Sequence, residues 1–174
     1  MSAGVRILLV DDEPRILGAL QRVLRQRLGA ECPLIDTCTD PFEALNRICA
    51  CDFDLVICDY MMPRMSGGEL LQALRDVAPD TVRIMLSASA EFDTVLSAIN
   101  QAQAFRFLRK PWEPDELADT VRQALAVRAG LLAARRDAGA MPVATPQEIE
   151  ARRLEADEPG LLDVRRDANG SVIL

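Results

Sequence analysis

Short apolar runs alternate with amphipathic stretches along the first 127 residues of the chain. Five short runs are predicted to be strands, and runs that are apolar throughout, such as Ile7–Val10, are typical of a parallel sheet covered on both faces. The five runs are Arg6–Val10, Leu34–Cys38, Leu55–Cys58, Arg83–Leu86 and Ala104–Leu108. In the stretches that follow them, apolar residues recur at helical spacing. These helical segments are Pro14–Leu28, Pro41–Ala50, Glu69–Val77, Phe92–Asn100 and Glu113–Val127. Five strand–helix repeats predict an α/β fold, a doubly wound (βα)5 domain whose five-stranded parallel sheet carries helices on both faces.

The ends of the first helical segment are marked by residue type. Pro14 suits a first helical turn, where its missing N–H group leaves no hydrogen bond unmade. Gly29 suits the position just past the last turn. Both residues support a helix over Pro14–Leu28.

Residues 128–174 are predicted to form a C-terminal extension to a domain at residues 1–127. The last helix of the domain is expected to continue to about Arg136 and to be ended by Gly139, and Gly139–Pro146 is expected to be a linker. A second helix is predicted at Pro146–Ala156, where Thr145–Glu148 forms a capping box. A β-hairpin is predicted at Leu161–Leu174, with its turn at Asn169 and Gly170. A lone two-stranded hairpin is marginal in water, so we expect it to dock on its own domain or on a dimer mate. Two alternatives stay open: an adaptor for another signalling protein, and a tail that becomes ordered only on binding.

Composition and charge exclude several classes of function. The 174 residues carry 27 acidic and 20 basic side chains, a net charge of −7, and no histidine. Without histidine the chain has no Ser-His-Asp or Cys-His nucleophile system, no His-ligated metal and no phospho-histidine of its own. DNA is not an expected partner, because phosphate contacts need a basic surface and the extension carries eight acidic and seven basic residues.

The apolar runs and the cysteines indicate the cellular compartment of the protein. No apolar run approaches the ~18–20 residues of a membrane span, and Val5–Val10 is too short for the core of a signal peptide. The five cysteines are odd in number and contain no CxxC pair, which fits a reducing cytoplasm better than a disulfide framework or a zinc knuckle. We expect them to be small buried hydrophobic residues; they are Cys32, Cys38, Cys49, Cys51 and Cys58. A cytoplasmic protein without membrane contact is the resulting expectation.

Polar residues stand where the predicted strands end. Asp11 and Asp12 follow the first run, Asp59 the third, Ser87 the fourth and Lys110 the fifth. Parallel α/β sheets bind ligands beyond the carboxyl ends of their strands, so these side chains are expected to converge at one edge. Taken singly, the acids could simply cap helices or occupy turns. Lys110 is more informative, because it is the only lysine beside 19 arginines.

Together, these groups suit phosphoryl transfer. Three carboxylates repel one another, and a hard divalent ion with oxygen ligands, Mg²⁺, relieves that repulsion. An aspartate bound to such an ion can attack a phosphoryl group and form an aspartyl-phosphate. The ion and an ammonium group then neutralise the charge that develops on the phosphoryl oxygens, and a nearby hydroxyl can donate a hydrogen bond to one of them.

The chain resembles the receiver domains of two-component response regulators, which have a flavodoxin-like fold. The resemblance rests on four segments that occur in the family's order, Ile7–Glu13, Asp59–Gly67, Ile84–Ala88 and Phe105–Pro111. It covers residues 5 to about 127, with no departure at a catalytic position. In such receivers an aspartate takes a phosphoryl group from the phospho-histidine of a kinase or from a small phosphodonor. The receiver catalyses its own phosphorylation and dephosphorylation, so it is a switch rather than a conventional enzyme.

The resemblance implies which residues bind the metal and accept the phosphoryl group. Asp59 would be the phospho-acceptor and a Mg²⁺ ligand. Asp12 would be a second direct ligand, and Asp11 would act mainly through water. The backbone carbonyl of Met61 would be a further ligand, so the implied cofactor is Mg²⁺.

The resemblance also implies a conformational switch. Ser87 and Lys110 would contact the phosphoryl group, and Pro111 would follow Lys110 through the cis bond typical of the family. Ser87 would then be drawn toward the phosphate, and Phe107 would turn inward. Many receivers have tyrosine at the position of Phe107, so its hydroxyl contact is absent here, and static core packing is the alternative. The changed surface would be the fourth helix, the fifth strand and the fifth helix.

The implied partners are a sensor histidine kinase or a phosphotransfer protein, and an unidentified downstream protein. A homodimer through the switch surface or through the extension is a further expectation. Phe105–Trp112 resembles receivers attached to HD-GYP phosphodiesterases, but an HD domain needs histidines, so neither that domain nor a DNA-binding output domain is expected in this chain. The alternative function is a pseudo-receiver, a scaffold that acts through the extension without phosphorylation. The intact acidic, hydroxyl and ammonium positions favour the phosphorylated switch.

Overall fold

The computed structural model of the protein describes residues 4–29, 33–88 and 103–140. The helix expected at Phe92–Asn100 lies outside the described residues, as do Cys32 and the helix and hairpin expected in the extension. The chain divides into two units, Met1–Ala134 and Arg135–Leu174. The sheet and the helices that cover it belong to the first unit.

The centre of the fold is a five-stranded parallel sheet with the strand order β2-β1-β3-β4-β5. The strands are β1 Arg6–Val10, β2 Leu34–Cys38, β3 Leu55–Asp59, β4 Val82–Ser87 and β5 Arg106–Arg109. Every residue of β3 and β4 is buried. This is the environment that the unbroken apolar runs predict, because a strand covered on both faces cannot alternate between apolar and polar residues.

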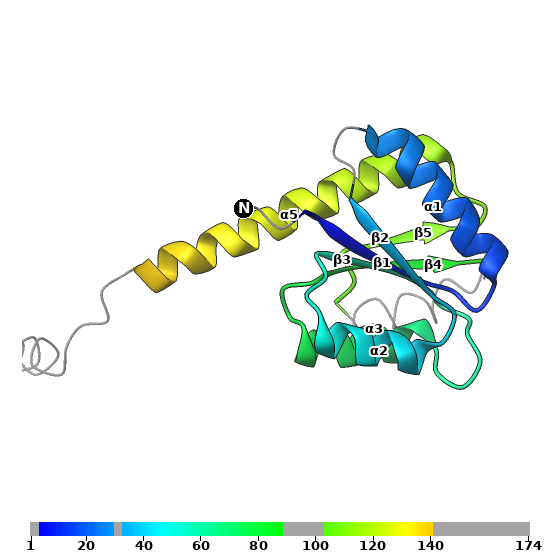
Figure 1. Ribbon diagram of the computed structural model, residues 1–174, viewed down its shortest axis with the longest axis horizontal. Coiled ribbons are helices and arrows are strands. Elements are labelled where there is room, and N and C mark those ends of the chain that lie inside the picture. Colours follow the sequence, from blue (N-terminus) through cyan, green and yellow to red (C-terminus); the bar gives the residue numbers. More distant parts are fainter. Residues whose placement is uncertain (1–3, 30–32, 89–102, 141–174) are drawn as a thin grey trace, which may run out of the picture. The chain divides into compact units, whose positions relative to one another are not determined.

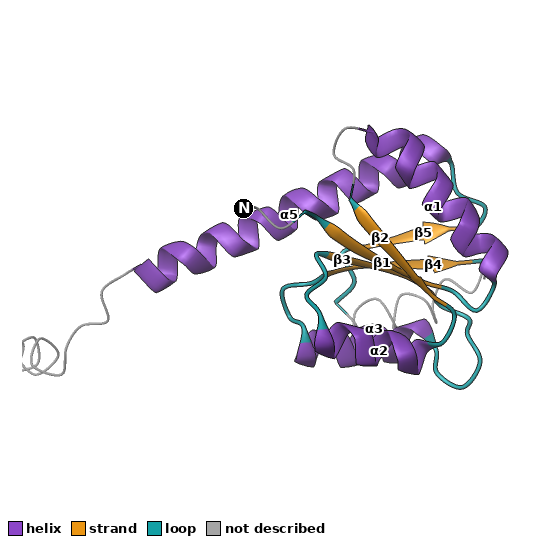
Figure 2. Ribbon diagram, viewed as in Figure 1, coloured by secondary structure: helices purple, strands orange, loops and turns teal. Residues whose placement is uncertain are grey.

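Two layers of helices enclose the sheet (Figure 1, Figure 2). The described helices are α1 Pro14–Leu28, α2 Pro41–Ala50, α3 Gly67–Val77 and α5 Pro114–Ala140. On one face, the buried side of α1 and the first turns of α5 pack against residues such as Ile7 and Ile57. On the other face, α2 and α3 pack against the residues between these, such as Leu8 and Val56. The doubly wound α/β fold predicted from the sequence is thereby confirmed.

The helix ends follow from side-chain chemistry. Pro14 opens α1, and Gly29 closes it with a φ of 44°, a backbone angle that suits glycine. The carboxylate of Asp40 caps α2 by accepting hydrogen bonds from the backbone N–H groups of Phe42 and Glu43. Ser66 and Glu69 form a reciprocal capping box at the start of α3. This box explains why α3 begins two residues earlier than the apolar spacing predicted.

The last helix corrects one expectation from the sequence. Gly139 was expected to end it, but α5 runs on to Ala140. A glycine inside a helix costs only about 1 kcal/mol relative to alanine, and the neighbours Ala138 and Ala140 favour the helix. The fifth strand differs as well, because it begins at Arg106 rather than at Ala104. Within the described residues, none of the helices combines the length and the apolar character needed to cross a membrane.

The expectation that the cysteines are buried is half correct among the four that the structure describes. Cys38 and Cys58 are buried, and burial raises the pKa of the Cys58 thiol well above its usual range. Cys49 and Cys51 are exposed. Cys49 lies on α2, which buries Ala44 and Ile48 rather than this residue, and Cys51 is the residue just past the end of that helix.

Candidate active site

The sheet brings four of the predicted site residues to its carboxyl edge. Asp59 and Ser87 are the last residues of the neighbouring strands β3 and β4, while Asp11 and Lys110 directly follow β1 and β5. Backbone hydrogen bonds continue the sheet past the strand ends, since the N–H of Lys110 donates to the carbonyl of Ser87 at 2.8 Å. The four side chains therefore sit on rigid backbone at the end of the sheet where α/β proteins bind ligands.

Three carboxylates gather at this edge. Asp11, Asp12 and Asp59 each offer an oxygen, and these oxygens lie within 4.8 Å of one another. Asp11 is fully buried and Asp59 nearly so, whereas Asp12 is exposed. One oxygen of Asp11 accepts the N–H of Glu13 at 2.9 Å, which fixes the carboxylate in the loop between β1 and α1. The cluster thus has a rigid, buried part and one side open to solvent.

Lys110 bridges the two buried carboxylates. Its Nζ lies 2.6 Å from Oδ2 of Asp11 and 2.8 Å from Oδ1 of Asp59, and its side chain is 13% exposed. Buried charges of one sign are costly unless they are paired, so the ammonium stabilises the pair of aspartates. Three carboxylates against one ammonium still leave an excess of negative charge at this edge.

The protonation equilibria of the site reflect this balance. Burial raises the pKa of the Asp59 carboxyl, and the hydrogen bond from Lys110 offsets the increase only in part. For Lys110, burial acts to lower the pKa, but hydrogen bonds to Asp11 and Asp59 outweigh it and the pKa is raised. Lys110 is therefore a charged ammonium throughout the neutral pH range.

The remaining predicted residues surround the cluster. Ser87 is fully buried at the end of β4, and the Lys110–Pro111 peptide bond is cis. Met61 follows Asp59 in the loop before α3, its side chain is 66% exposed, and its backbone N–H donates to the Asp59 carboxylate. Phe107, on β5, is half-buried against the core under α2 and α3.

Gly67 is a site residue that sequence reasoning missed. A Cβ atom at this position would lie 2.0 Å from the carbonyl oxygen of Asp59, far inside any real contact distance. The N–H of Gly67 donates to the carbonyl of Tyr60 at 2.9 Å, which holds the start of α3 against the end of β3. Only a residue without a side chain permits this approach. The sequence contains the glycine, but nothing in its spacing reveals the close contact.

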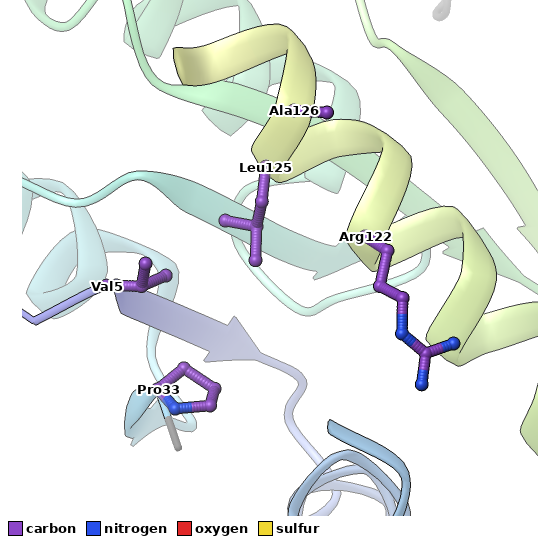
Figure 3. Close-up of a pocket in the computed structure, with 5 residues that line it drawn as sticks. All are labelled: Val5, Pro33, Arg122, Leu125 and Ala126. Atoms are coloured by element: carbon purple, nitrogen blue, oxygen red, sulfur yellow. The ribbon is translucent and has the colours of Figure 1, made fainter. Parts of the chain in front are cut away.

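A pocket elsewhere in the molecule is unrelated to this cluster. It has a volume of about 310 Å³ and lies near the amino ends of β1 and β2, beside α5. Its lining residues are Val5, Pro33, Arg122, Leu125 and Ala126 (Figure 3). None of them carries a carboxylate or a nucleophile, and Arg122 already donates to Asp119 and to the carbonyl of Arg27, each at 2.7 Å. The chemistry of the described residues therefore concentrates at the opposite edge of the sheet.

The donor set of the acid cluster fits a hard divalent cation. All the side-chain ligands on offer are carboxylate oxygens, they come from three residues, and they are close enough to share one ion. Mg²⁺ prefers oxygen ligands and is commonly bound through one or two carboxylates together with water and phosphate oxygens. The exposed side of Asp12 leaves room for such ligands. The arrangement can thus combine a metal ion, a carboxylate nucleophile and a fixed ammonium.

Comparison with known proteins assigns this arrangement to a family. Residues 7–122 match the response regulator receiver domain family. The chain is 35% identical over 125 residues to the hydrogenase transcriptional regulatory protein HoxA of Bradyrhizobium diazoefficiens, covering 72% of this chain and 25% of HoxA. It is 31% identical to the transcriptional regulatory protein TcrA of Mycobacterium tuberculosis, covering 89% of this chain and 54% of TcrA. The chain thus spans between a quarter and about half of the length of these relatives.

Solved structures agree with the sequence relatives. The signal receiver domain of an HD domain-containing protein from Pseudomonas fluorescens superposes with a TM-score of 0.67 at 32% identity, covering 74% of this chain and 99% of that domain. A CheY-like receiver domain from Methanospirillum hungatei has a TM-score of 0.67 at 26% identity, covering 74% of this chain and 98% of that one. The first of these agrees with the likeness of Phe105–Trp112 to receivers of HD-type regulators.

Proposed function

Because the chain belongs to the family of response regulator receiver domains of two-component systems, we propose that it is a phosphorylation switch that accepts a phosphoryl group on Asp59 in a Mg²⁺-dependent reaction. The observation that carries this proposal is the bridge from Lys110 to Asp11 and Asp59 beside a third carboxylate. A scaffold that merely kept the fold would gain no stability from three acids held within 4.8 Å of one another.

Each residue has a chemical task in this proposal. Asp59 is the nucleophile. Asp12 and Asp59 would hold the metal directly, Asp11 would act mainly through water, and the carbonyl of Met61 would be a further ligand. Mg²⁺, when bound, neutralises charge on the phosphoryl oxygens. Lys110 offers a fixed positive charge for those oxygens, and the hydroxyl of Ser87 is a hydrogen-bond donor of the right kind at the end of the next strand.

The proposed output is a change of surface. A phosphoryl group adds negative charge and acceptor oxygens at the edge where Ser87 and Lys110 lie. Ser87 moves toward it, and Phe107, which is only half-buried on β5, turns further into the core. We place the responding surface on β5, α5 and the helix expected at Phe92–Asn100. A downstream protein or a second copy of the chain would bind there.

Beryllofluoride, a stable mimic of a phosphoryl group, tests this proposal against the scaffold alternative. With Mg²⁺ present, the fluorescence of Trp112, the only tryptophan, is expected to change in a saturable manner as beryllofluoride is added. Trp112 is two residues from Lys110 and partly buried, so it reports on this edge of the sheet. Magnesium with fluoride but without beryllium is the control. A chain that binds no beryllofluoride under these conditions would be a scaffold.

The phosphodonor is proposed to be a protein that contacts α1. This helix carries four arginines and no acidic residue, although the whole chain has a net charge of −7. Gly18, Arg22 and Arg25 line part of a shallow pocket of about 350 Å³ on its outer side. Because α1 begins directly after the acid cluster, a donor with an acidic face along α1 would have its phosphoryl group within reach of Asp59.

Charge reversal on α1 is expected to separate protein donors from small ones. The double substitution R22E/R25E should slow phosphoryl transfer from the cognate kinase by about tenfold or more at low ionic strength, because it removes electrostatic attraction. Transfer from acetyl phosphate should be unchanged, since that donor needs no contact with α1. R75E, a charge reversal on α3 at the other face of the sheet, is the control. Equal slowing with both donors would contradict this placement of the partner.

A further inference from the structure

The loop between β3 and α3 begins at the proposed phospho-acceptor and makes a tight turn at Arg64. The backbone N–H of Met65 donates to the carbonyl of Pro63 at 2.8 Å, and Arg64 between them has a φ of 70°. A hydrogen bond between residues two apart, around a positive φ, is a γ-turn of the rare and strained kind. Residues other than glycine seldom adopt this angle, so contacts outside the turn must hold Arg64 in it.

The side chain of Arg64 makes such contacts with the start of α2. Its guanidinium donates to Oδ2 of Asp40 and lies over the ring of Phe42, 5.4 Å from the ring centroid. Asp40 is itself held in place, because its other carboxylate oxygen accepts the backbone N–H groups of Phe42 and Glu43 at 2.8 and 3.4 Å. Arg64 therefore links the β3–α3 loop to the capped first turn of α2.

The same loop carries the backbone of Met61 beside the acid cluster. The N–H of Met61 donates to the Asp59 carboxylate, and its carbonyl is the further metal ligand in the proposed function. At the base of the loop, the N–H of Gly67 donates to the carbonyl of Tyr60 at 2.9 Å. The loop is thus fixed at its base by a backbone hydrogen bond and at its turn by the side chain of Arg64.

We propose that Arg64 is a positioning residue for the metal site, whose contacts with Asp40 and Phe42 hold the β3–α3 loop in the shape that keeps the backbone of Met61 at Asp59. This inference rests on the proposed function and extends it to a residue outside the acid cluster. Without these contacts the strained turn relaxes, and the loop must be ordered again whenever the metal binds. The affinity for Mg²⁺ then falls, whereas the chemical step at saturating Mg²⁺ is unaffected.

Titration of the full chain with Mg²⁺, followed by the fluorescence of Trp112, tests this role. R64A should raise the half-saturating Mg²⁺ concentration by about three- to tenfold, the range expected for an exposed ion pair together with a cation–π contact. The rate of phosphorylation by acetyl phosphate at saturating Mg²⁺ should stay close to that of the wild type. Removing a positive charge would by itself favour Mg²⁺, so weaker binding by R64A is not an effect of charge.

Arg47 provides a matched control for this titration. It is a second exposed arginine, it pairs with Glu43 within α2, and it also donates to the carbonyl of Thr37. R47A removes the same charge and a similar ion pair without touching the β3–α3 loop, so its half-saturating Mg²⁺ concentration should not rise. An R64A variant that binds Mg²⁺ as well as the wild type, or an equal loss of affinity in R47A, would overturn the proposal.

Hydrogen exchange of the metal-free protein tests the link from its other end. Serine is about as good an N-cap as aspartate, so D40S keeps the start of α2 and removes the carboxylate that Arg64 contacts. In both D40S and R64A, the backbone amides of residues 60–66 should exchange at least about threefold faster than in the wild type. R64A/D40S should exchange no faster than R64A, because the two substitutions remove one shared contact. Unchanged exchange in R64A, or fully additive effects, would contradict the link.

The two proposals fail in different ways. If the wild type shows no saturable response to Mg²⁺ at all, the metal-dependent function is wrong and the positioning role of Arg64 falls with it. If the wild type binds Mg²⁺ and R64A binds it equally well or more tightly, only the role of Arg64 is wrong.

Discussion

Replacing Asp59 by asparagine is expected to abolish phosphorylation while the fold persists. Asparagine has nearly the same shape but no nucleophilic carboxylate, and it withdraws one of the three charges that attract the metal. Lys110 keeps Asp11 as a partner at 2.6 Å, so the change leaves no unpaired buried ammonium. Incubation with acetyl phosphate and Mg²⁺ should produce no mass gain in this variant, and beryllofluoride should give no response. A Mg²⁺-dependent mass gain that survives in D59N would place the phosphoryl group elsewhere.

The same variant should change stability in a pH-dependent manner. Burial raises the pKa of Asp59 in the folded state, so the folded protein holds this proton more tightly than the unfolded chain does. Above the unfolded pKa the ionised carboxylate therefore destabilises the fold, and below it the effect disappears. D59N should unfold at a higher temperature than the wild type at pH 7, and the difference should shrink as the pH falls through the raised pKa of Asp59 and be absent below about 4. If the difference in unfolding temperature between D59N and the wild type grew toward acid pH, the pKa of Asp59 would be lowered by folding rather than raised.

Replacing Gly67 by alanine is expected to damage both the fold and the site. The added Cβ would lie 2.0 Å from the carbonyl oxygen of Asp59 and 2.8 Å from its carbonyl carbon, so the backbone of the phospho-acceptor must move. Overpacking of this kind typically lowers the free energy of unfolding by about 1–3 kcal/mol. The added Cβ would meet backbone atoms, which can move away less easily than side chains can. We expect a loss of about 3 kcal/mol in the free energy of unfolding and a severe loss of phosphorylation by acetyl phosphate.

Gly18 provides a matched control for this substitution. A Cβ added at Gly18, in the interior of α1, would meet nothing within 4 Å. G18A should therefore stabilise the protein by about 0.5–1 kcal/mol, because alanine favours a helix over glycine. Its phosphorylation by acetyl phosphate should match the wild type. If G67A and G18A had similar effects on unfolding and on phosphorylation, the close approach of α3 to Asp59 would not constrain the site.

The fold could be predicted from the sequence because its strands are buried on both faces. Uninterrupted runs such as Leu55–Cys58 are compatible with few other structures once helical segments separate them, and the parallel sheet then follows. The predicted ends of the helices were wrong where hydrogen bonds of capping side chains or the helix propensity of neighbouring residues outweighed the spacing of apolar residues. The capping box at Ser66 makes α3 begin before the first residue of its apolar pattern. Alanines on both sides of Gly139 favour the helix, so α5 continues past this glycine.

The site could be predicted only as a set of residues at one edge. Strand ends identify Asp11, Asp59 and Lys110, since the carboxyl ends of parallel strands meet there. Spacing says nothing about which atoms touch. The bridge made by the Lys110 ammonium depends on distances of 2.6 and 2.8 Å between segments far apart in sequence. The need for glycine at position 67 likewise depends on a carbonyl eight residues away, which becomes a neighbour only after α3 has packed beneath β3.

Peptide mapping of the wild-type chain shows whether Asp59 is the residue that receives the phosphoryl group. The chain is incubated with Mg²⁺ and acetyl phosphate, reduced with borohydride to trap the acyl phosphate, and digested. We expect one modified residue, Asp59, and no modification when Mg²⁺ is removed by a chelator. Modification at another residue, or at Asp59 to the same extent without the metal, would contradict it.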